Sequence, residues 1–223
     1  DGFDWDILDP NNAWAYIGYW GDHQIIYLLK LLEASHKYHP GKLLSLLNKD
    51  IYTYANVPYR IKPYSKILED HNNTVDFDFE LNQHINERVE KIGTDGKLIQ
   101  GRNGKIYHVS LLEKLMVPML VKFSNYIPQA GIWMNTQRPE WNDANNALVG
   151  NGTPMVTLYY LRIYIIFLQE LLEDFDLDRV NVSNEVFEYF HKILDGLQNF
   201  CSILSNTISD QDRKQITDVL STT

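Results

Sequence analysis

The chain has 223 residues, of which 44% are hydrophobic, and this is enough apolar mass for the core of one globular domain. Its formal net charge is −9 and lysine and arginine form no cluster, which argues against nucleic acid and anionic membranes as partners. The single cysteine, Cys201, excludes an internal disulfide and a cysteine-based metal site. Its apolar neighbours predict a buried, inert thiol.

The first 22 residues are predicted to be a loop. Their aspartates lack the glycine and terminal glutamate of a calcium-binding EF-hand, which favours a solvated acidic segment. The chain begins without methionine or a signal peptide, so we expect either a removed segment or a piece of a longer protein. Asp22 is then predicted to cap a helix that ends near Tyr38, before a His-Pro-Gly turn.

The middle of the chain is predicted to alternate short helices with a β-hairpin. A short helix is expected over residues 42–47 and a surface helix over residues 76–92, where charged residues gather on one face. Residues 97–109 read as two β-prone runs around Asn103-Gly104, a strong hairpin turn signal.

Four helices are predicted after the hairpin. The first begins with a capping box, because Ser110 precedes Glu113 by three residues. The second follows Thr153-Pro154 and is apolar nearly all round, which predicts burial on every side. Its apolar run, residues 155–168, is shorter than the ~20 residues of a membrane span. These elements predict a mainly α fold in one domain, residues 1–223. The predicted ranges are 110–126, 153–173, 184–205 and 209–223.

Residues 131–152 (GIWMNTQRPEWNDANNALVGNG) concentrate groups that can hold a polar substrate directly before an apolar helix. Trp133 and Trp141 can stack on the apolar face of a sugar ring. Planar side chains between and after them can bond its hydroxyl groups. These side chains are Gln137, Arg138, Asn142, Asn145 and Asn146.

Asp143 is the candidate catalytic residue. An apolar wall raises the pKa of a carboxyl group, which keeps a general acid protonated near neutrality, and glycosidic cleavage needs such an acid at the leaving oxygen. The alternative role of Asp143 is to cap a short helix over residues 144–148. Glu140 is either a second catalytic carboxylate or the ion-pair partner of Arg138.

A second candidate stretch is Trp20-Gly21-Asp22-His23-Gln24, at the start of the first helix. Asp22, His23 and Gln24 can bind sugar hydroxyls, and the alternative for Asp22 is a capping role alone. No second histidine follows at ligand spacing, so no metal and no cofactor are expected. All five tryptophans lie near these two stretches, which favours a shared aromatic cleft over two local packing clusters. They are Trp5, Trp14, Trp20, Trp133 and Trp141.

Together the two stretches resemble the catalytic domain of the cellobiose-phosphorylase-like glycosidases, an (α/α)6 toroid. In that family a Trp-Asn-Asp motif carries the general acid, and the resemblance implies this role for Asp143, with Trp141 and Asn142 before it. In that family an Arg-Asp pair and a following Gln bind the sugar, and the resemblance implies this role for Asp22 and Gln24. The two aspartates are 121 residues apart, similar to the family's spacing.

The chain also departs from that family's pattern. Gly21 stands in place of the arginine, and Ala144 and Asn145 replace glycine and methionine. The family's phosphate-binding residues lie further downstream than Thr223, so the resemblance does not separate hydrolysis from phosphorolysis. Trehalases and processing α-glucosidases share the toroid and a similar acid motif. A complete toroid has twelve helices, so we expect part or all of one, with a β-hairpin insertion, in a longer protein.

These observations predict an inverting glycoside hydrolase or phosphorylase that acts on an oligosaccharide or disaccharide, with water or inorganic phosphate as the attacking group. We expect a cytoplasmic location, and neither nucleic acid nor a membrane as partner. One alternative is a non-catalytic carbohydrate-binding or scaffold domain derived from such an enzyme. Another is a helical interaction protein whose polar loops are structural only.

Overall fold

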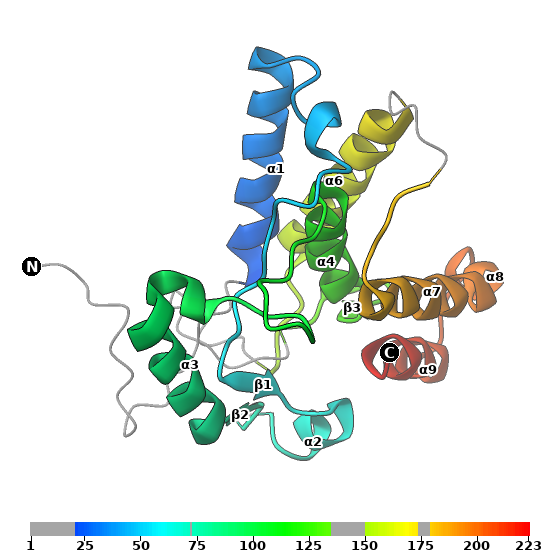
Figure 1. The fold of residues 1–223 in the computed structure, drawn as a ribbon. Helices are drawn as coiled ribbons and strands as arrows, with labels where there is room; N and C mark the ends of the chain where they lie inside the picture. Colours follow the sequence, from blue (N-terminus) through cyan, green and yellow to red (C-terminus); the bar gives the residue numbers. More distant parts are fainter. Residues whose placement is uncertain (1–20, 72, 135–149, 174–178) are drawn as a thin grey trace, which may run out of the picture. The chain divides into compact units, whose positions relative to one another are not determined.

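The computed structural model describes residues 21–71, 73–134, 150–173 and 179–223, with side chains from Ile25 onward. The chain divides into two compact units. Unit 1 comprises residues 1–21, 56–97 and 134–152, and unit 2 comprises residues 22–55, 98–133 and 153–223. The described residues form eight α-helices and two small sheets, which confirms the mainly α class (Figure 1).

Unit 1 contains a two-stranded antiparallel sheet and a surface helix. Tyr59 pairs with Phe77 in this sheet. The surface helix starts at Phe79, three residues later than predicted, because residues 75–77 extend to form a strand. Asp78 caps it by accepting a hydrogen bond from Leu81 N at 2.9 Å. The elements are β1 (Tyr59–Ile61), α2 (Tyr64–Glu69), β2 (Val75–Phe77), α3 (Phe79–Ile92) and η3 (Gly93–Lys97).

Unit 2 contains the larger cores. One cluster of buried side chains joins α1, α4 and α6, and a second joins α4, α7 and α9. Tyr164 of α6 is fully buried and donates a hydrogen bond to Leu115 O at 2.8 Å, which ties α6 to α4. The elements are α1 (Gly21–Tyr38), η2 (Leu44–Leu46), α4 (Leu111–Phe123), β3 (Tyr126–Ile127), β4 (Gly131–Ile132), α6 (Met155–Glu173), α7 (Asn184–Asn199), α8 (Cys201–Leu204) and α9 (Asp210–Ser221).

Helix α6 is buried along one stripe only, so the prediction of burial on every side is wrong. The stripe repeats at helical spacing because only that face meets the core. Among the described helices, α6 alone is long and apolar enough to cross a membrane by length and composition. The stripe comprises Thr157, Leu161, Tyr164, Leu168 and Leu171, and the exposed apolar residues are Met155, Val156, Tyr159, Ile163, Ile166 and Leu172.

Several local predictions were confirmed in part. The first helix ends at Tyr38 as predicted. The hairpin of residues 97–109 is reduced to single bridges such as Gln100 opposite Ile106, and Gly104 takes the positive φ of 73° that its turn requires. Cys201 is exposed, so the prediction of a buried thiol is wrong: Phe200, before it, fills the core position instead.

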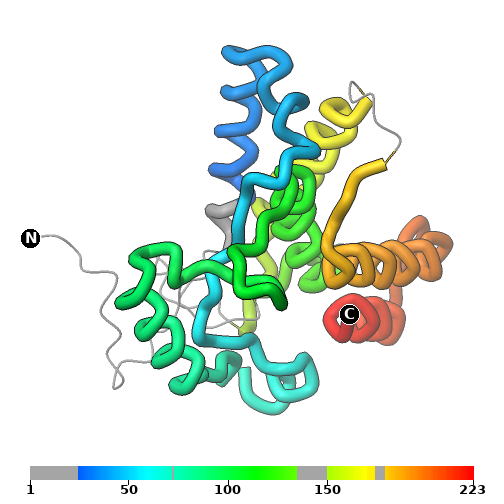
Figure 2. The backbone as a smooth tube through the Cα atoms, viewed as in Figure 1, coloured from blue at the N-terminus to red at the C-terminus, as the bar shows by residue number. Residues whose placement is uncertain are grey.

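Helices α1 and α6 run in the same direction. The Lys30 Nζ atom lies 5.8 Å from the ring centroid of Tyr160, and further along both helices the His36 and Phe167 rings are 6.0 Å apart. Figures 1 and 2 draw both helices with their N-terminal ends low in the view. Lys30 and His36 follow one another along α1 in the same order as their partners Tyr160 and Phe167 along α6, so both helices start at the same end of unit 2.

Candidate functional site

Trp133 is the one predicted site residue whose side chain the structure describes. The residues of the second stretch, Asp22, His23 and Gln24, form the first turn of α1. The side chains of these three residues lie outside the described part, and so do the remaining candidates, which are Trp20, Arg138, Glu140, Trp141, Asn142, Asp143 and Asn146.

Trp133 follows strand β4 directly and is half-buried. Strand β4 pairs with β3, so that Tyr126 lies opposite Ile132. The Trp133 N–H extends this pairing by donating to Asn125 O at 2.7 Å. The indole is therefore attached to a fixed backbone at the start of the tryptophan-rich stretch.

The two ends of that stretch are joined within unit 1. Met134 N donates to Gly152 O at 3.0 Å, and Gly150 N donates to Met134 O at 2.6 Å. Gly150 has a positive φ of 76°, and a Cβ atom there would lie 2.5 Å from the His71 ring. Met134 is therefore paired with Gly150 and Gly152, and the predicted acid Asp143 belongs to residues 135–149, which lie outside the described part of the chain.

Gly131 allows β4 to lie directly on the residues before α6. A Cβ atom at Gly131 would lie 2.7 Å from Thr153 O and 3.0 Å from Pro154 O, and neither backbone oxygen can move freely.

Gly131→Ala is therefore expected to lower the free energy of unfolding by about 1–3 kcal/mol, measured by urea denaturation. Gly101→Ala is the control, because its nearest atom is the Asn103 Oδ1 side-chain atom, 3.3 Å away. Equal stability of both variants would contradict this account of Gly131.

Glu113 forms a buried junction that the sequence does not predict. It is only 2% exposed, and its carboxylate accepts hydrogen bonds from Ser183 N at 2.7 Å and Ser183 Oγ at 2.9 Å. Glu113 N donates to Ser110 Oγ at 3.2 Å, which confirms Ser110 as N-cap. Its carboxylate, however, binds the start of α7 instead of the Ser110 backbone, so the reciprocal half of the predicted capping box is wrong.

Tyr54 and Lys114 complete this junction. The Tyr54 hydroxyl donates to Glu113 Oε1 at 3.2 Å. Burial raises the pKa of Tyr54, and the nearby Glu113 carboxylate raises it further. The Lys114 Nζ atom lies 3.9 Å from the Tyr54 ring centroid and donates to Thr53 O at 2.9 Å. Burial lowers the pKa of Lys114, and Glu113 opposes this effect.

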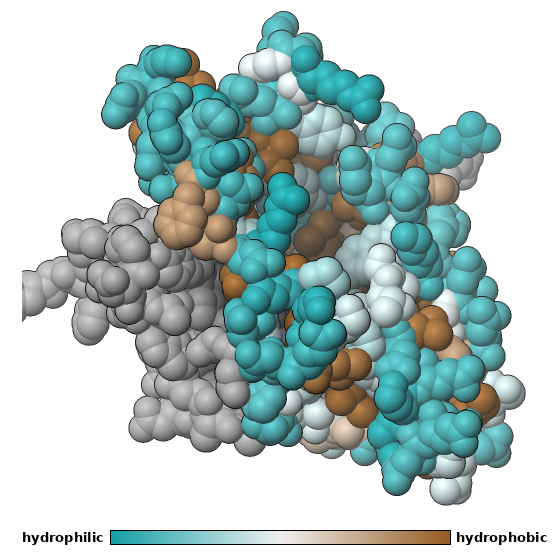
Figure 3. Space-filling view, turned by 90° about the horizontal axis from the view of Figure 1, so that it is seen from below, coloured by the Kyte–Doolittle hydropathy of each residue, from teal (hydrophilic) through white to brown (hydrophobic). Residues whose placement is uncertain are grey.

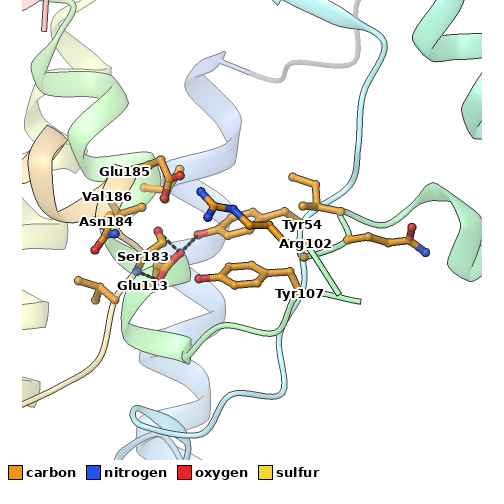
Figure 4. Close-up of a pocket in the computed structure, with 13 residues that line it drawn as sticks. Tyr54, Arg102, Tyr107, Glu113, Ser183, Asn184, Glu185 and Val186 are labelled. Carbon is orange, nitrogen blue, oxygen red and sulfur yellow. Dashed lines mark hydrogen bonds between the residues drawn. The ribbon is translucent and has the colours of Figure 1, made fainter. Parts of the chain in front are cut away.

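A pocket of about 680 Å³ opens beside this junction, within unit 2. In Figure 4 the hydroxyl groups of Tyr54 and Tyr107 point toward Glu113 and Ser183, and Arg102 and Glu185 lie above them. Burial raises the pKa of Tyr107, and the carboxylates of Glu113, Glu185 and Asp50 raise it further. The inner wall is held by the hydrogen bonds of Glu113, and the outer wall is lined by side chains from residues 100–107 and from the start of α7.

The buried tyrosines predict how stability depends on alkaline pH. Burial raises the pKa of Tyr164 above its ordinary value of 10.0, so the folded protein keeps that proton when the unfolded chain has lost it. The contribution of Tyr164 to the free energy of unfolding is therefore complete below pH 10. It is lost as pH rises toward the folded pKa, by up to about 1.4 kcal/mol per pH unit. The lowered pKa of Lys114 has the opposite effect: below its ordinary value of 10.5, down to the lowered pKa, it makes the free energy of unfolding rise with pH.

We therefore expect the free energy of unfolding to fall above pH 10. Urea denaturation between pH 8 and 12 measures this fall, and Tyr164→Phe should make it less steep. A slope that is the same in the Tyr164→Phe variant would show that this hydroxyl does not contribute.

No family model matched the chain, and a comparison with curated proteins likewise gave no match. Within the described residues, no group of three or more histidine, cysteine, aspartate or glutamate side chains could hold a metal ion.

Proposed function

We propose that this chain is part of an inverting glycoside-cleaving enzyme of the (α/α)6-toroid type, with Asp143 as its general acid. The proposal joins the Trp-Asn-Asp pattern at residues 141–143 to the Gly-Asp-His-Gln pattern at residues 21–24. Both stretches place tryptophans, carboxylates and amides just before or at a helix start.

The common direction of α1 and α6 is the observation that carries this proposal. Lys30 is close to Tyr160 and His36 is close to Phe167, so the two helices begin at one end of unit 2. Each helix follows one of the tryptophan-rich stretches. The first turn of a helix also has free backbone N–H groups and a positive partial charge, both suited to binding sugar oxygens. An antiparallel pair would have put the two helix starts at opposite ends.

In the proposed reaction Asp143 gives its proton to the glycosidic oxygen as the bond to the anomeric carbon breaks. Water or inorganic phosphate attacks that carbon from the opposite face, and the configuration inverts. With water, a general base is needed roughly 6.5–9.5 Å from the acid. The indoles of Trp20, Trp133 and Trp141 stack on sugar rings. Hydroxyl groups are bound by Asp22, His23, Gln24, Arg138, Glu140, Asn142 and Asn146.

The direct test is an activity survey of the full-length protein. Disaccharides and oligosaccharides of several linkages are incubated with and without inorganic phosphate, and released sugar and sugar phosphate are measured. The proposal expects turnover of at least one substrate. Isothermal titration with the same sugars separates the alternative of a non-catalytic domain, because binding without any turnover would favour that alternative.

A further inference from the structure

We propose that the pocket beside Tyr107 is a second carbohydrate-binding site, formed by residues outside the two tryptophan-rich stretches. We call it the Tyr107 pocket and define it by Gln100, Arg102, Tyr107, Ser183, Asn184 and Glu185. All of these residues belong to unit 2. The inference goes beyond the proposed reaction and does not depend on Asp143.

The Tyr107 pocket has a fixed inner wall. Glu113 is held by three hydrogen bonds, two of which come from Ser183 and one from Tyr54. Because that carboxylate is 2% exposed, it supports the wall but is closed to a ligand. A rigid wall lowers the entropic cost of binding. The volume of about 680 Å³ lies in the ordinary range for small-molecule sites.

The outer wall offers polar side chains that have no side-chain partner among the residues that the structure describes. Within the described ranges, no side-chain hydrogen bond or ion pair is formed by Gln100, Arg102, Tyr107, Asn184 or Glu185. Gln100 and Asn184 each carry both donor and acceptor groups, Arg102 adds donors and Glu185 adds acceptors. This mixture is suited to a ligand whose hydroxyl groups both donate and accept.

The charges and the apolar surface of the outer wall restrict the class of ligand further. The accessible Arg102 and Glu185 side chains have opposite charges, so the outer wall does not select an ion of one sign. Tyr107 is 40% exposed and its ring offers an apolar face, and Val186 also lines the pocket. A neutral sugar has hydroxyl groups around its edge and C–H groups on its faces, and therefore fits this wall.

Sugar binding in a Trp141→Ala background tests the Tyr107 pocket separately from the proposed active loop. Saturation-transfer NMR and calorimetry with cellobiose, maltose and trehalose are applied to the full-length variant. We expect residual sugar binding that becomes at least about tenfold weaker when Tyr107→Ala is added. Tyr107→Phe, which keeps the ring, should retain most of the binding.

Tyr38→Ala is the matched control, because Tyr38 is also an exposed tyrosine of unit 2 but does not line the pocket. It should leave sugar binding unchanged, and thermal melting should show that each variant is folded. The proposal is overturned if the Trp141→Ala protein binds none of the three sugars. It is also overturned if Tyr107→Ala and Tyr38→Ala have the same effect. Loss of turnover in Asp143 variants bears on the proposed reaction alone, so the two failures are distinguishable.

Discussion

Asp143→Asn is expected to lower kcat of the full-length protein by about 10²–10⁴-fold on a natural disaccharide, because a positioned general acid contributes that much. The amide cannot protonate the leaving oxygen, although it fills the same space. The loss should shrink for a glycosyl fluoride, since fluoride leaves without a proton. Steady-state kinetics on both substrates measure the difference.

Glu140→Gln is the matched control for this experiment, because it removes a carboxylate from the same stretch three residues earlier. We expect a smaller loss, which is similar for the disaccharide and the fluoride. Undiminished turnover in the Asp143→Asn variant would refute the assignment of the general acid. An equal loss on both substrates would assign Asp143 to positioning instead of proton transfer.

Glu113→Ala is expected to lower the free energy of unfolding by about 2–4 kcal/mol, because three donors lose their common acceptor. The donors come from Ser183 at the start of α7 and from Tyr54, so the loss should also loosen the attachment of α7 to α4. Urea denaturation gives the stability. Hydrogen exchange should show faster opening at Ser183 and in the first turn of α7.

Glu113→Gln should have an intermediate effect, because it keeps one acceptor oxygen and directs an NH₂ group at donors. The control is Glu188→Gln, an exposed position on α7 whose side chain forms no hydrogen bond in the described part of the chain. This variant should stay within about 0.5 kcal/mol of the parent protein. If Glu113→Ala is no more destabilising than the control, the buried junction does not hold the two helices together.

Local signals in the sequence predicted most helices because they act over a few residues. Ser110 caps α4 as its spacing predicts, and the helix before His39 ends where the turn signal stands. The predicted start of α3 was wrong because residues 75–77 pair with a strand sixteen residues earlier. Helical periodicity within residues 76–92 does not reveal a pairing partner outside that range. The exposed face of α6 was missed for a related reason: hydrophobicity does not reveal which stripe meets the core.

The site was predictable to a more limited extent. The Trp-Asn-Asp pattern indicated a sugar-cleaving site, and it stays a prediction for Asp143, which lies outside the described residues. The junction of Glu113 and Ser183 joins residues 70 apart, so no short motif contains both. Ser183 and Glu113 each read as ordinary helix-start residues. The packing of α4 against α7 brings them together beside the Tyr107 pocket.

The proposed shared site can be seen in a crystal structure of the full-length protein with a bound disaccharide. We expect one sugar-sized cavity that both tryptophan-rich stretches line. In it the Asp143 carboxyl lies within hydrogen-bond distance of the glycosidic oxygen, and Asp22 binds hydroxyl groups of the same sugar. The contrary result would be a sugar bound elsewhere, with the Asp143 carboxylate engaged only by backbone N–H groups at the start of a helix.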